Sequence, residues 1–440
     1  MIRNAALCFA ATLVLASCAQ EELILPGERL DIRASVDPEV EAPEAVDRTP
    51  REVAVSLPGQ VANTDWTHRN GSVRHTITHP ALGDGLQLAW SAEIGEGNSR
   101  GNRIANPPVV ADGRIFTIDS LATVSAFSIG GALLWQRDLT PPTDRPDEGA
   151  GGGVSVAGDT LYASSGFGTL TAMDVATGET RWVQRLDAPV SGSATVDGNI
   201  AYIVTRDSVA WAIDTRNGRV LWTLPGAPSG TGIVGGGAPA ISDRLVILPF
   251  PSSEISGALR QSGVRVWGGA VSGSRIGSAY TGFSDINSDP VVVGRTIFAG
   301  NAAGRVAALD AITGERNWTA REGAFDVIWP VGNALFFVSD RNELIRLDAA
   351  TGAVTWAVQL PYYTDDRERR RKAIFAHYGP VLAGGRLYIA SGDGQLRAFD
   401  PASGQQISQI TMPDGAAAAP VVANRTMYIV TEAGELRAYR

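Results

Sequence analysis

The chain has 440 residues and a formal net charge of −9, with 46 acidic and 37 basic residues. This balance argues against a nucleic-acid partner, which would need a basic surface. Both cysteines, Cys8 and Cys18, lie close to the N-terminus, so the body of the chain has no disulfide, no cysteine metal site and no thiol nucleophile.

The first 17 residues have the pattern of a signal peptide: Arg3 is followed by an apolar run that ends at Leu15. That run is too short for a stable bilayer span. It leads into Leu15-Ala-Ser-Cys18, which resembles the lipobox of bacterial lipoproteins, whereas the alternative is an ordinary cleavage site beside a chance cysteine. The resemblance implies that residues 1–17 are removed and that Cys18 becomes the lipid anchor. Ala19 replaces the Asp typical of inner-membrane lipoproteins, so we expect the outer membrane, periplasmic face.

Residues 18–60 are rich in proline and glutamate and have little apolar periodicity. Such a composition cannot bury enough apolar surface to fold and is typical of a flexible segment. We predict a tether with an r.m.s. reach of roughly 35 Å. The remainder, 61–440, is predicted to be one folded domain.

From residue 86 onward the chain repeats one motif, in which Asp is followed by Gly at the fourth position and Trp at the eighth. Asp can cap a turn through its carboxylate, and Gly can take the left-handed conformation. The clearest copies are Asp174–Trp182, Asp214–Trp222, Asp310–Trp318 and Asp348–Trp356.

Two further strands are predicted before each turn, as in Pro290–Ala299 and Pro420–Val430, where β-branched and aromatic runs flank a short turn. The unit is therefore a four-stranded antiparallel meander of propeller-blade size. Outer strands are expected at eight positions: Trp90, Trp135, Trp182, Trp222, Trp267, Trp318, Trp356 and Ser408.

The series begins with an outer strand within Leu86–Ile94 and stops at Arg440 without one. We therefore predict an all-β, eight-bladed propeller in which this N-terminal strand completes the last blade and removes a free edge. A seven-bladed ring with one irregular repeat is the alternative. The tryptophans recur at blade period, so they are expected to pack between neighbouring blades and not to form a ligand site.

Few residues suggest chemistry. His68, His75 and His79 lie close together, and the last two have the i, i+4 spacing of a helical metal pair. Gly71 and Pro80 flank them without a carboxylate motif, so we expect no metal site in this irregular lead-in. The charged run 365–372 is expected to be a solvated loop, with a partner or anionic-lipid contact as the alternative.

The repeat resembles the pyrroloquinoline-quinone (PQQ) propeller superfamily, some members of which are quinone-dependent alcohol dehydrogenases. Those enzymes carry adjacent cysteines over the cofactor, calcium ligands and a catalytic Asp. This chain has no cysteine beyond Cys18 and no insertion between blades. We therefore expect no enzymatic activity, no catalytic residue and no cofactor, with a PQQ-dependent dehydrogenase as one alternative.

The lipobox, the acidic tether and the propeller together resemble the BamB family, scaffold lipoproteins of the outer-membrane β-barrel assembly machinery. The resemblance implies docking on the POTRA repeats of BamA, association with the other assembly lipoproteins and assistance to unfolded outer-membrane proteins. A periplasmic propeller with another partner is the second alternative.

Within that resemblance, Ser284–Val293 is similar to a family loop in which two acidic residues contact BamA. Asp285 matches, and Asn287 stands where the family often has a second Asp. In the companion loop Ile233 fits an apolar contact position, whereas Val234 replaces an expected Arg. The predicted contact residues are thus Asp285, Asn287 and Ile233, and Asp285 is expected to be solvent-exposed.

Overall fold

The structure is a computed structural model that describes residues 48–51, 53–149, 151–190, 192–229, 236–273, 285–286 and 288–440. The predicted signal peptide and tether residues 18–47 lie outside the described residues. The chain divides into two compact units. One comprises Met1–Glu44 and Tyr363–Ala373, and the other comprises Ala45–Tyr362 and Ile374–Arg440; the second is called the propeller unit below.

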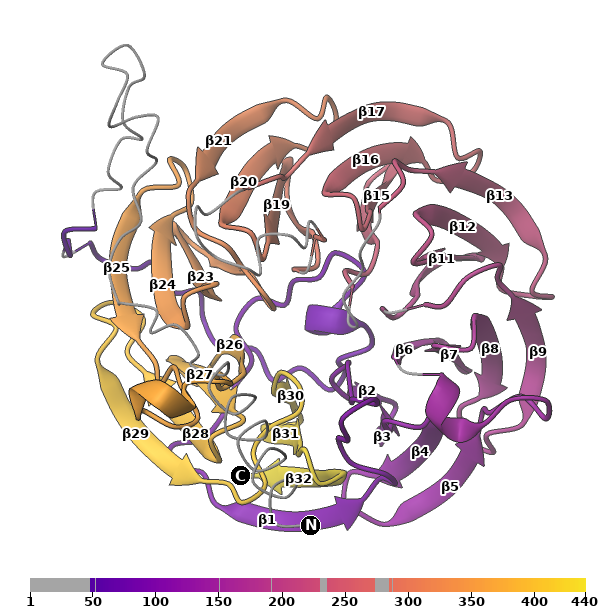
Figure 1. Cartoon of the computed structure of the whole chain (residues 1–440), viewed down its shortest axis with the longest axis horizontal. Coiled ribbons are helices and arrows are strands. Elements are labelled where there is room, and N and C mark those ends of the chain that lie inside the picture. Colours follow the sequence, from indigo (N-terminus) through magenta and orange to yellow (C-terminus); the bar gives the residue numbers. More distant parts are fainter. Residues whose placement is uncertain are drawn as a thin grey trace, which may run out of the picture. The chain divides into compact units, whose positions relative to one another are not determined.

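The propeller unit consists of eight four-stranded antiparallel sheets around a common centre (Figure 1). This arrangement confirms the predicted eight blades and excludes the seven-bladed alternative. Blades 1 to 4 are formed by β2 (Val109–Ala111), β3 (Arg114–Ile118), β4 (Thr123–Ser128) and β5 (Leu133–Asp138); β6 (Gly152–Ala157), β7 (Thr160–Ser165), β8 (Thr169–Asp174) and β9 (Thr180–Arg185); β10 (Thr195–Asp197), β11 (Ile200–Val204), β12 (Val209–Asp214) and β13 (Val220–Pro225); and β14 (Ala240–Ser242), β15 (Leu245–Pro249), β16 (Glu254–Leu259) and β17 (Arg265–Ala270).

The remaining blades follow the same order until the ring closes. Blades 5 to 8 are formed by β18 (Val291–Val293), β19 (Thr296–Asn301), β20 (Arg305–Asp310) and β21 (Arg316–Ala320); β22 (Trp329–Val331), β23 (Ala334–Val338), β24 (Glu343–Asp348) and β25 (Val354–Gln359); β26 (His377–Ala383), β27 (Arg386–Ser391), β28 (Gln395–Phe399) and β29 (Gln406–Thr411); and β30 (Val421–Ala423), β31 (Thr426–Val430), β32 (Glu435–Tyr439) and β1 (Leu88–Glu93). Three short 3-10 helices also occur in the described chain: η2 (Arg69–Gly71), η3 (Pro146–Glu148) and η5 (Glu368–Arg370).

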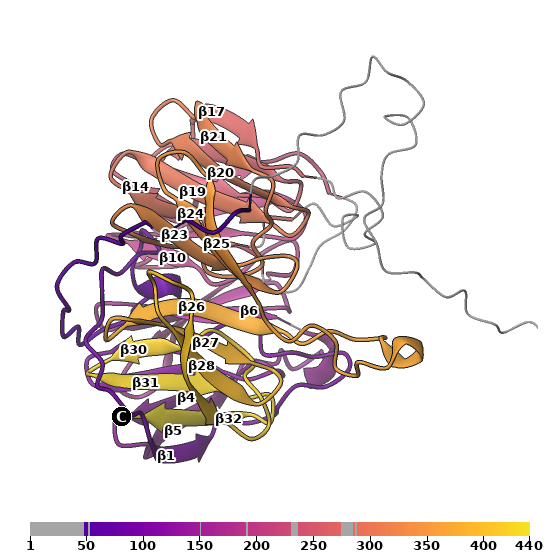
Figure 2. The same cartoon turned by 90° about the vertical axis from the view of Figure 1, so that its left-hand side faces the viewer.

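The ring is closed by the two ends of the propeller sequence. β1 pairs antiparallel with β32, and the C-terminus lies beside this blade in both ribbon views (Figures 1 and 2). Beyond the strands, the Gln87 backbone N–H donates to the Arg440 carbonyl at 2.8 Å, and the Gln87 carbonyl accepts from the Arg440 N–H at 3.0 Å. The predicted closure by the N-terminal strand is confirmed.

Each outer-strand tryptophan packs against the turn of the next blade, as predicted from its period. The Trp135 indole N–H donates to the Val175 carbonyl of blade 2 at 3.1 Å. The same ring covers Gly178, which has φ +69°, and a Cβ there would lie 2.6 Å from the indole. Glycine is therefore required at position 178 for two reasons: the positive φ of the backbone and the close approach of the indole ring.

Ser408 on β29 occupies the position where the other seven outer strands carry Trp. The following blade has no Asp–Gly turn, because its last two strands, β32 and β1, come from opposite ends of the chain. An indole at position 408 would thus have no turn glycine to stack on. Ring closure explains the one exception in the tryptophan series.

The lead-in before β1 forms an inner ring of hydrogen bonds. η2 lies at the centre of the propeller (Figure 1), and residues 54–80 reach every blade. Many of these contacts satisfy the free inner edge of a blade's first strand. In order from blade 1 to blade 8, the bonded pairs are Trp66–Val110, Thr67–Val156, His68–Val196, Val73–Ile241, Arg74–Val292, Ala54–Asn333, Pro80–Gly384 and Asn63–Asn424.

Upstream of this inner ring, the chain is held on blade 6. Arg48 forms ion pairs with Glu322 at 2.6 Å and Glu343 at 2.8 Å. The Arg51 backbone N–H donates to the carbonyl of Thr355 on β25 at 2.9 Å. Arg48 and Arg51, which the sequence analysis assigned to the tether, are therefore bound to the propeller.

Candidate partner-binding site

Asp285 and Ile286 belong to the described part of the predicted docking loop, between β17 and β18. The Asp285 side chain is buried, at 3% exposure, and Ile286 is also buried. The expectation that Asp285 is solvent-exposed is therefore wrong. The position of Asp285 between two strands gave no signal of this burial.

The structure brings the two predicted contact loops together. The Gly237 backbone N–H donates to the Ile286 carbonyl at 3.3 Å. The Ala238 N–H donates to a carboxylate oxygen of Asp289 at 2.7 Å. Asn287 in one loop and Ile233 in the other lie outside the described residues. The two loops, about 50 residues apart in sequence, are thus one structural unit.

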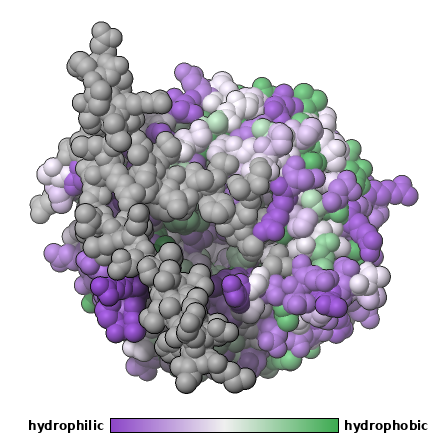
Figure 3. All heavy atoms as spheres, viewed as in Figure 1, coloured by the Kyte–Doolittle hydropathy of each residue, from purple (hydrophilic) through white to green (hydrophobic). Residues whose placement is uncertain are grey.

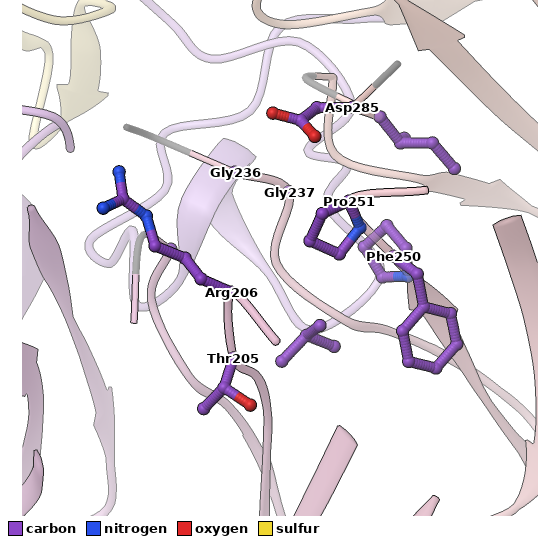
Figure 4. A pocket seen from close by; sticks show the side chains of 11 residues that line it. Thr205, Arg206, Gly236, Gly237, Phe250, Pro251 and Asp285 are labelled. Carbon is purple, nitrogen blue, oxygen red and sulfur yellow. The ribbon is translucent and has the colours of Figure 1, made fainter. Parts of the chain in front are cut away.

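A pocket opens at this junction (Figure 4). Asp285 and Arg206 line it from two different loops, and Phe250 and Pro251 form an apolar part of its wall (Figure 4). The remaining lining residues come from the loops of blades 3 to 5 and their flanking strand ends: Gly192, Val204, Thr205, Gly236, Gly237, Pro249 and Ile286.

Arg206 is the residue of this pocket that sequence reasoning missed. It lies in the turn between β11 and β12, where its backbone N–H donates to the Pro189 carbonyl at 3.0 Å. Its guanidinium makes no ion pair with any residue that the structure describes, and its Nε is buried without a hydrogen-bond partner among them, although the side chain is only partly exposed. A cation, a carboxylate and an aromatic wall in one concave site suit a polar partner side chain with an apolar stem. No sequence pattern marks Arg206, because only the fold brings it to the same pocket as Asp285.

Beneath the pocket, a buried charge network fixes the docking loop to the inner ring. Arg69 of η2 pairs with Asp289 at 2.8 Å, and its guanidinium lies 4.0 Å from Asp326. The Asn70 side chain donates a further hydrogen bond to Asp289 at 3.2 Å. Burial raises the pKa of Asp326 to about 6, against the opposing effect of Arg69. The loop thus rests on paired buried charges, which hold a single arrangement.

The three clustered histidines form hydrogen bonds between the inner ring and the blades. His68 accepts a hydrogen bond from the Val196 backbone N–H at 3.1 Å, and His79 accepts one from Gly385 at 2.9 Å. His75 lies 2.9 Å from the Pro290 carbonyl, to which its neutral ring donates. Burial lowers the pKa of His68 to about 3 and also lowers the pKa of His75. Over the described ranges, no three His, Cys, Asp or Glu side chains are grouped as a metal site.

The exposed apolar residues of the ring are scattered. Half of those in the described chain lie singly or in pairs on outer strands, for example Leu133, Val183 and Val266. Figure 3 shows hydrophobic residues dispersed among hydrophilic ones along the visible rim. Isolated exposed apolar residues are normal for a soluble surface.

The family model described as "Outer membrane protein assembly factor BamB" matches residues 120–358 and 365–440. The chain belongs to the BamB family. It is 23% identical over 359 residues to the BamB of Moranella endobia, covering 80% of this chain and 89% of the relative. It is 23% identical over 352 residues to that of Escherichia coli, covering 79% and 86%.

Solved structures agree on the fold. BamB from Moraxella catarrhalis is similar with a TM-score of 0.63 and 19% identity, over 81% of this chain and 97% of that chain. The quinohemoprotein alcohol dehydrogenase of Comamonas testosteroni is similar with a TM-score of 0.64 and 15% identity, over 86% and 80%. The adjacent cysteines that the quinone enzymes place over their cofactor have no counterpart here, since no cysteine follows Cys18. No helix in the described ranges is long and apolar enough to cross a membrane.

Proposed function

We propose that this BamB-family propeller is a non-enzymatic scaffold of outer-membrane protein assembly, held at the periplasmic face of the outer membrane by acylated Cys18. Family membership supports the assembly role. The lipobox-like Leu15–Cys18 sequence and the proline-rich residues 18–47 support the anchor and tether. The proposed partners are the POTRA repeats of BamA and the other assembly lipoproteins, with unfolded outer-membrane proteins as clients.

The observation that carries the docking proposal is the convergence of both family-like contact loops on the pocket of Arg206 and Asp285. Loops held on a rigid ring are suited to binding because the scaffold fixes their arrangement. We propose that this pocket receives a side chain of a POTRA repeat. Arg206 and Asp285 would contact its charged or polar end, and Phe250 its apolar part.

Reversing the charge of the pocket should weaken binding without unfolding the ring. Arg206→Glu is expected to reduce BamA affinity by about 2 kcal/mol or more, the cost typical of disrupting a charged interface contact. The melting temperature should change little, because the Arg206 guanidinium makes no ion pair within the described chain. Binding is measured by titrating purified POTRA repeats against the mature protein, and stability by a melting curve.

The matched control is Arg219→Glu, the same charge change on an exposed residue in the turn at the opposite end of blade 3. It should bind as wild type does. Equal binding by wild type and Arg206→Glu would remove the pocket as the docking site. Failure of wild-type protein to bind BamA would instead reject the partner and favour a propeller with another ligand.

The anchor is tested separately. Cys18→Ser is expected to abolish incorporation of labelled fatty acid and to release the protein from the membrane fraction, because Cys18 is the sole cysteine after the proposed cleavage point. Cys8→Ser, within the proposed signal peptide, is the control and should still be acylated. Undiminished labelling of Cys18→Ser would contradict the lipoprotein assignment.

A further inference from the structure

A second hollow lies where the lead-in passes blades 7 and 8. Its volume is about 420 Å³, which is in the range of sites that hold small ligands or single side chains. The turn between β30 and β31 contributes Arg425, and the lead-in contributes the other lining residues. The site is called the Arg425 hollow below and is lined by Gln60, Ala62, Ala81, Leu82, Gly83 and Arg425, all within the propeller unit.

Backbone hydrogen bonds hold the walls of this hollow. The Val61 N–H donates to the His79 carbonyl, and the Ala81 N–H donates to the Val61 carbonyl, both at 2.8 Å. The Asn424 N–H, beside Arg425 in the same turn, donates to the Asn63 carbonyl at 2.8 Å. The two lead-in segments and the turn of blade 8 therefore keep one arrangement, and a preorganised site loses little entropy when a ligand binds.

Arg425 is the charged residue among the six that line the hollow. It is exposed, and its guanidinium forms no ion pair or hydrogen bond with any residue that the structure describes. The same holds for the amide of Gln60. Asp84, which follows the lining segment, is already paired with Arg386 at 2.9 Å. A guanidinium and an amide that both lack internal partners are suited to a carboxylate ligand.

The backbone at Arg425 gives a second indication of function. Arg425 has φ +55°, in the left-handed region that favours glycine. The equivalent second residues of the first turns in blades 1 and 7 are Gly113 and Gly385, with φ +70° and +78°. Arginine at this position carries strain that glycine would avoid, and no ion pair within the described chain offsets it. Strain of this kind is typical of functional sites.

The Arg425 hollow and the pocket of Arg206 and Asp285 open on opposite faces of the ring. In each blade the turn after the first strand and the turn after the second strand lie at opposite ends of the strands, because neighbouring strands are antiparallel. Arg425 lies in the first turn of blade 8, and Arg206 lies in the second turn of blade 3. A ligand in one site therefore leaves the other accessible.

We propose that the Arg425 hollow binds an acidic segment of a partner protein, in which a carboxylate pairs with Arg425 and an adjoining apolar side chain contacts Leu82. Anionic lipid is the competing ligand. Lipid surfaces are recognised by clusters of several cations, whereas this hollow combines a single cation with the apolar side chains of Ala62, Ala81 and Leu82. The proposal goes beyond docking on BamA, because it gives the scaffold a second binding face.

The site is tested by methyl NMR of the mature full-length protein in neutral detergent, with the Leu82 methyl resonances as the local reporter. The probes are the peptides acetyl-Gly-Glu-X-Glu-Gly-amide, in which X is Val, Leu or Phe. At least one should shift the Leu82 resonances to saturation. Its counterpart with Gln in place of both Glu residues should bind about tenfold more weakly, because charge-assisted hydrogen bonds are replaced by neutral ones.

Two substitutions separate binding from folding. Arg425→Glu should abolish the peptide-induced shift. Arg425→Gly should also weaken peptide binding by about tenfold or more, yet it should melt at or above the wild-type temperature, because glycine adopts the left-handed conformation without strain. An arginine with a merely structural role would instead lower the melting temperature when replaced by glycine.

The matched control is Arg244→Glu, the same charge change on the exposed second residue of the corresponding turn in blade 4. It should bind the peptides as wild type does, and Arg425→Glu should keep wild-type affinity for the POTRA repeats. Equal peptide binding by wild type and Arg425→Glu, or no saturable shift with any of the peptides, would overturn the proposal. Shifts of Leu82 with dihexanoyl-phosphatidylglycerol but with none of the peptides would assign the hollow to anionic lipid instead.

Discussion

Deletion of Leu86–Ile94 is expected to prevent accumulation of a soluble monomer. The deletion removes β1, leaves the edge of β32 unpaired and takes away the buried side chains of Leu86 and Ile94. Each buried aliphatic residue contributes about 2–5 kcal/mol, so the total approaches the whole stability of a typical domain. The loss also removes Trp90, which stacks on Gly131 of blade 1 and contacts Tyr428.

The measurement is the monomer yield on size exclusion, followed by a melting curve of whatever remains. Leu88→Ser, at a 54% exposed position on the same strand, is the control and should be monomeric and nearly as stable as wild type. A monomeric deletion variant that melts with wild type would mean that the last blade closes without β1.

Arg69→Ala is expected to lower the free energy of unfolding by about 3–5 kcal/mol, because it leaves a buried carboxylate without its partner. Arg69 and Asp289 are both buried and 2.8 Å apart, and Asp326 also faces the guanidinium. The substitution removes the central charge that connects η2 with the loop before β18. Urea unfolding of wild type and variant gives the difference directly.

The control is Arg74→Ala on the same segment, whose ion pair with Asp243 is solvent-exposed, with side-chain exposures of 42% and 77%. An exposed pair contributes about 0.2–1 kcal/mol, so this variant should be nearly as stable as wild type. The double variant Arg69→Ala with Asp289→Ala should recover part of the loss, since it removes the unpaired charge. Equal unfolding midpoints for Arg69→Ala and Arg74→Ala would contradict a structural role for the central network.

Several features of the ring could be predicted because they depend on local, repeated geometry. The conformation of a turn such as Asp348–Gly352 is specified by its own residues. The Asp348 carboxylate accepts hydrogen bonds from the backbone N–H groups of Ala350 and Thr351, and Gly352 has φ +73°. The indole of Trp318 then fits only above that glycine. Because this turn recurs along the chain, the number of blades could be predicted from the sequence. The closure could be predicted because the series begins with an outer strand and ends without one.

The inner ring and the docking pocket could not be predicted in this way. Residues 54–80 have no repeat; residues up to 60 were assigned to the tether and the rest to an irregular lead-in. Several of them, such as Trp66, Thr67 and Val73, form hydrogen bonds to a blade far away in sequence. The one available signal was composition: Trp66, Ile77 and Leu82 are more apolar than a solvated connector requires. The burial of Asp285 likewise depends on loops of other blades, and the residues next to Asp285 in the sequence do not indicate it.

The sequence by itself determined the eight blades and the pairing of β1 with β32, because short-range turn chemistry repeated at a fixed period specifies both. The resemblance to the BamB family came from the combination of this repeat with the lipobox and the acidic tether. The tertiary structure alone decided that Arg206 and Asp285 line one pocket, and that Arg69 pairs with Asp289 and approaches Asp326. The physical reason is distance along the chain. These contacts join loops and segments that only ring closure brings together, and no local conformational preference encodes them.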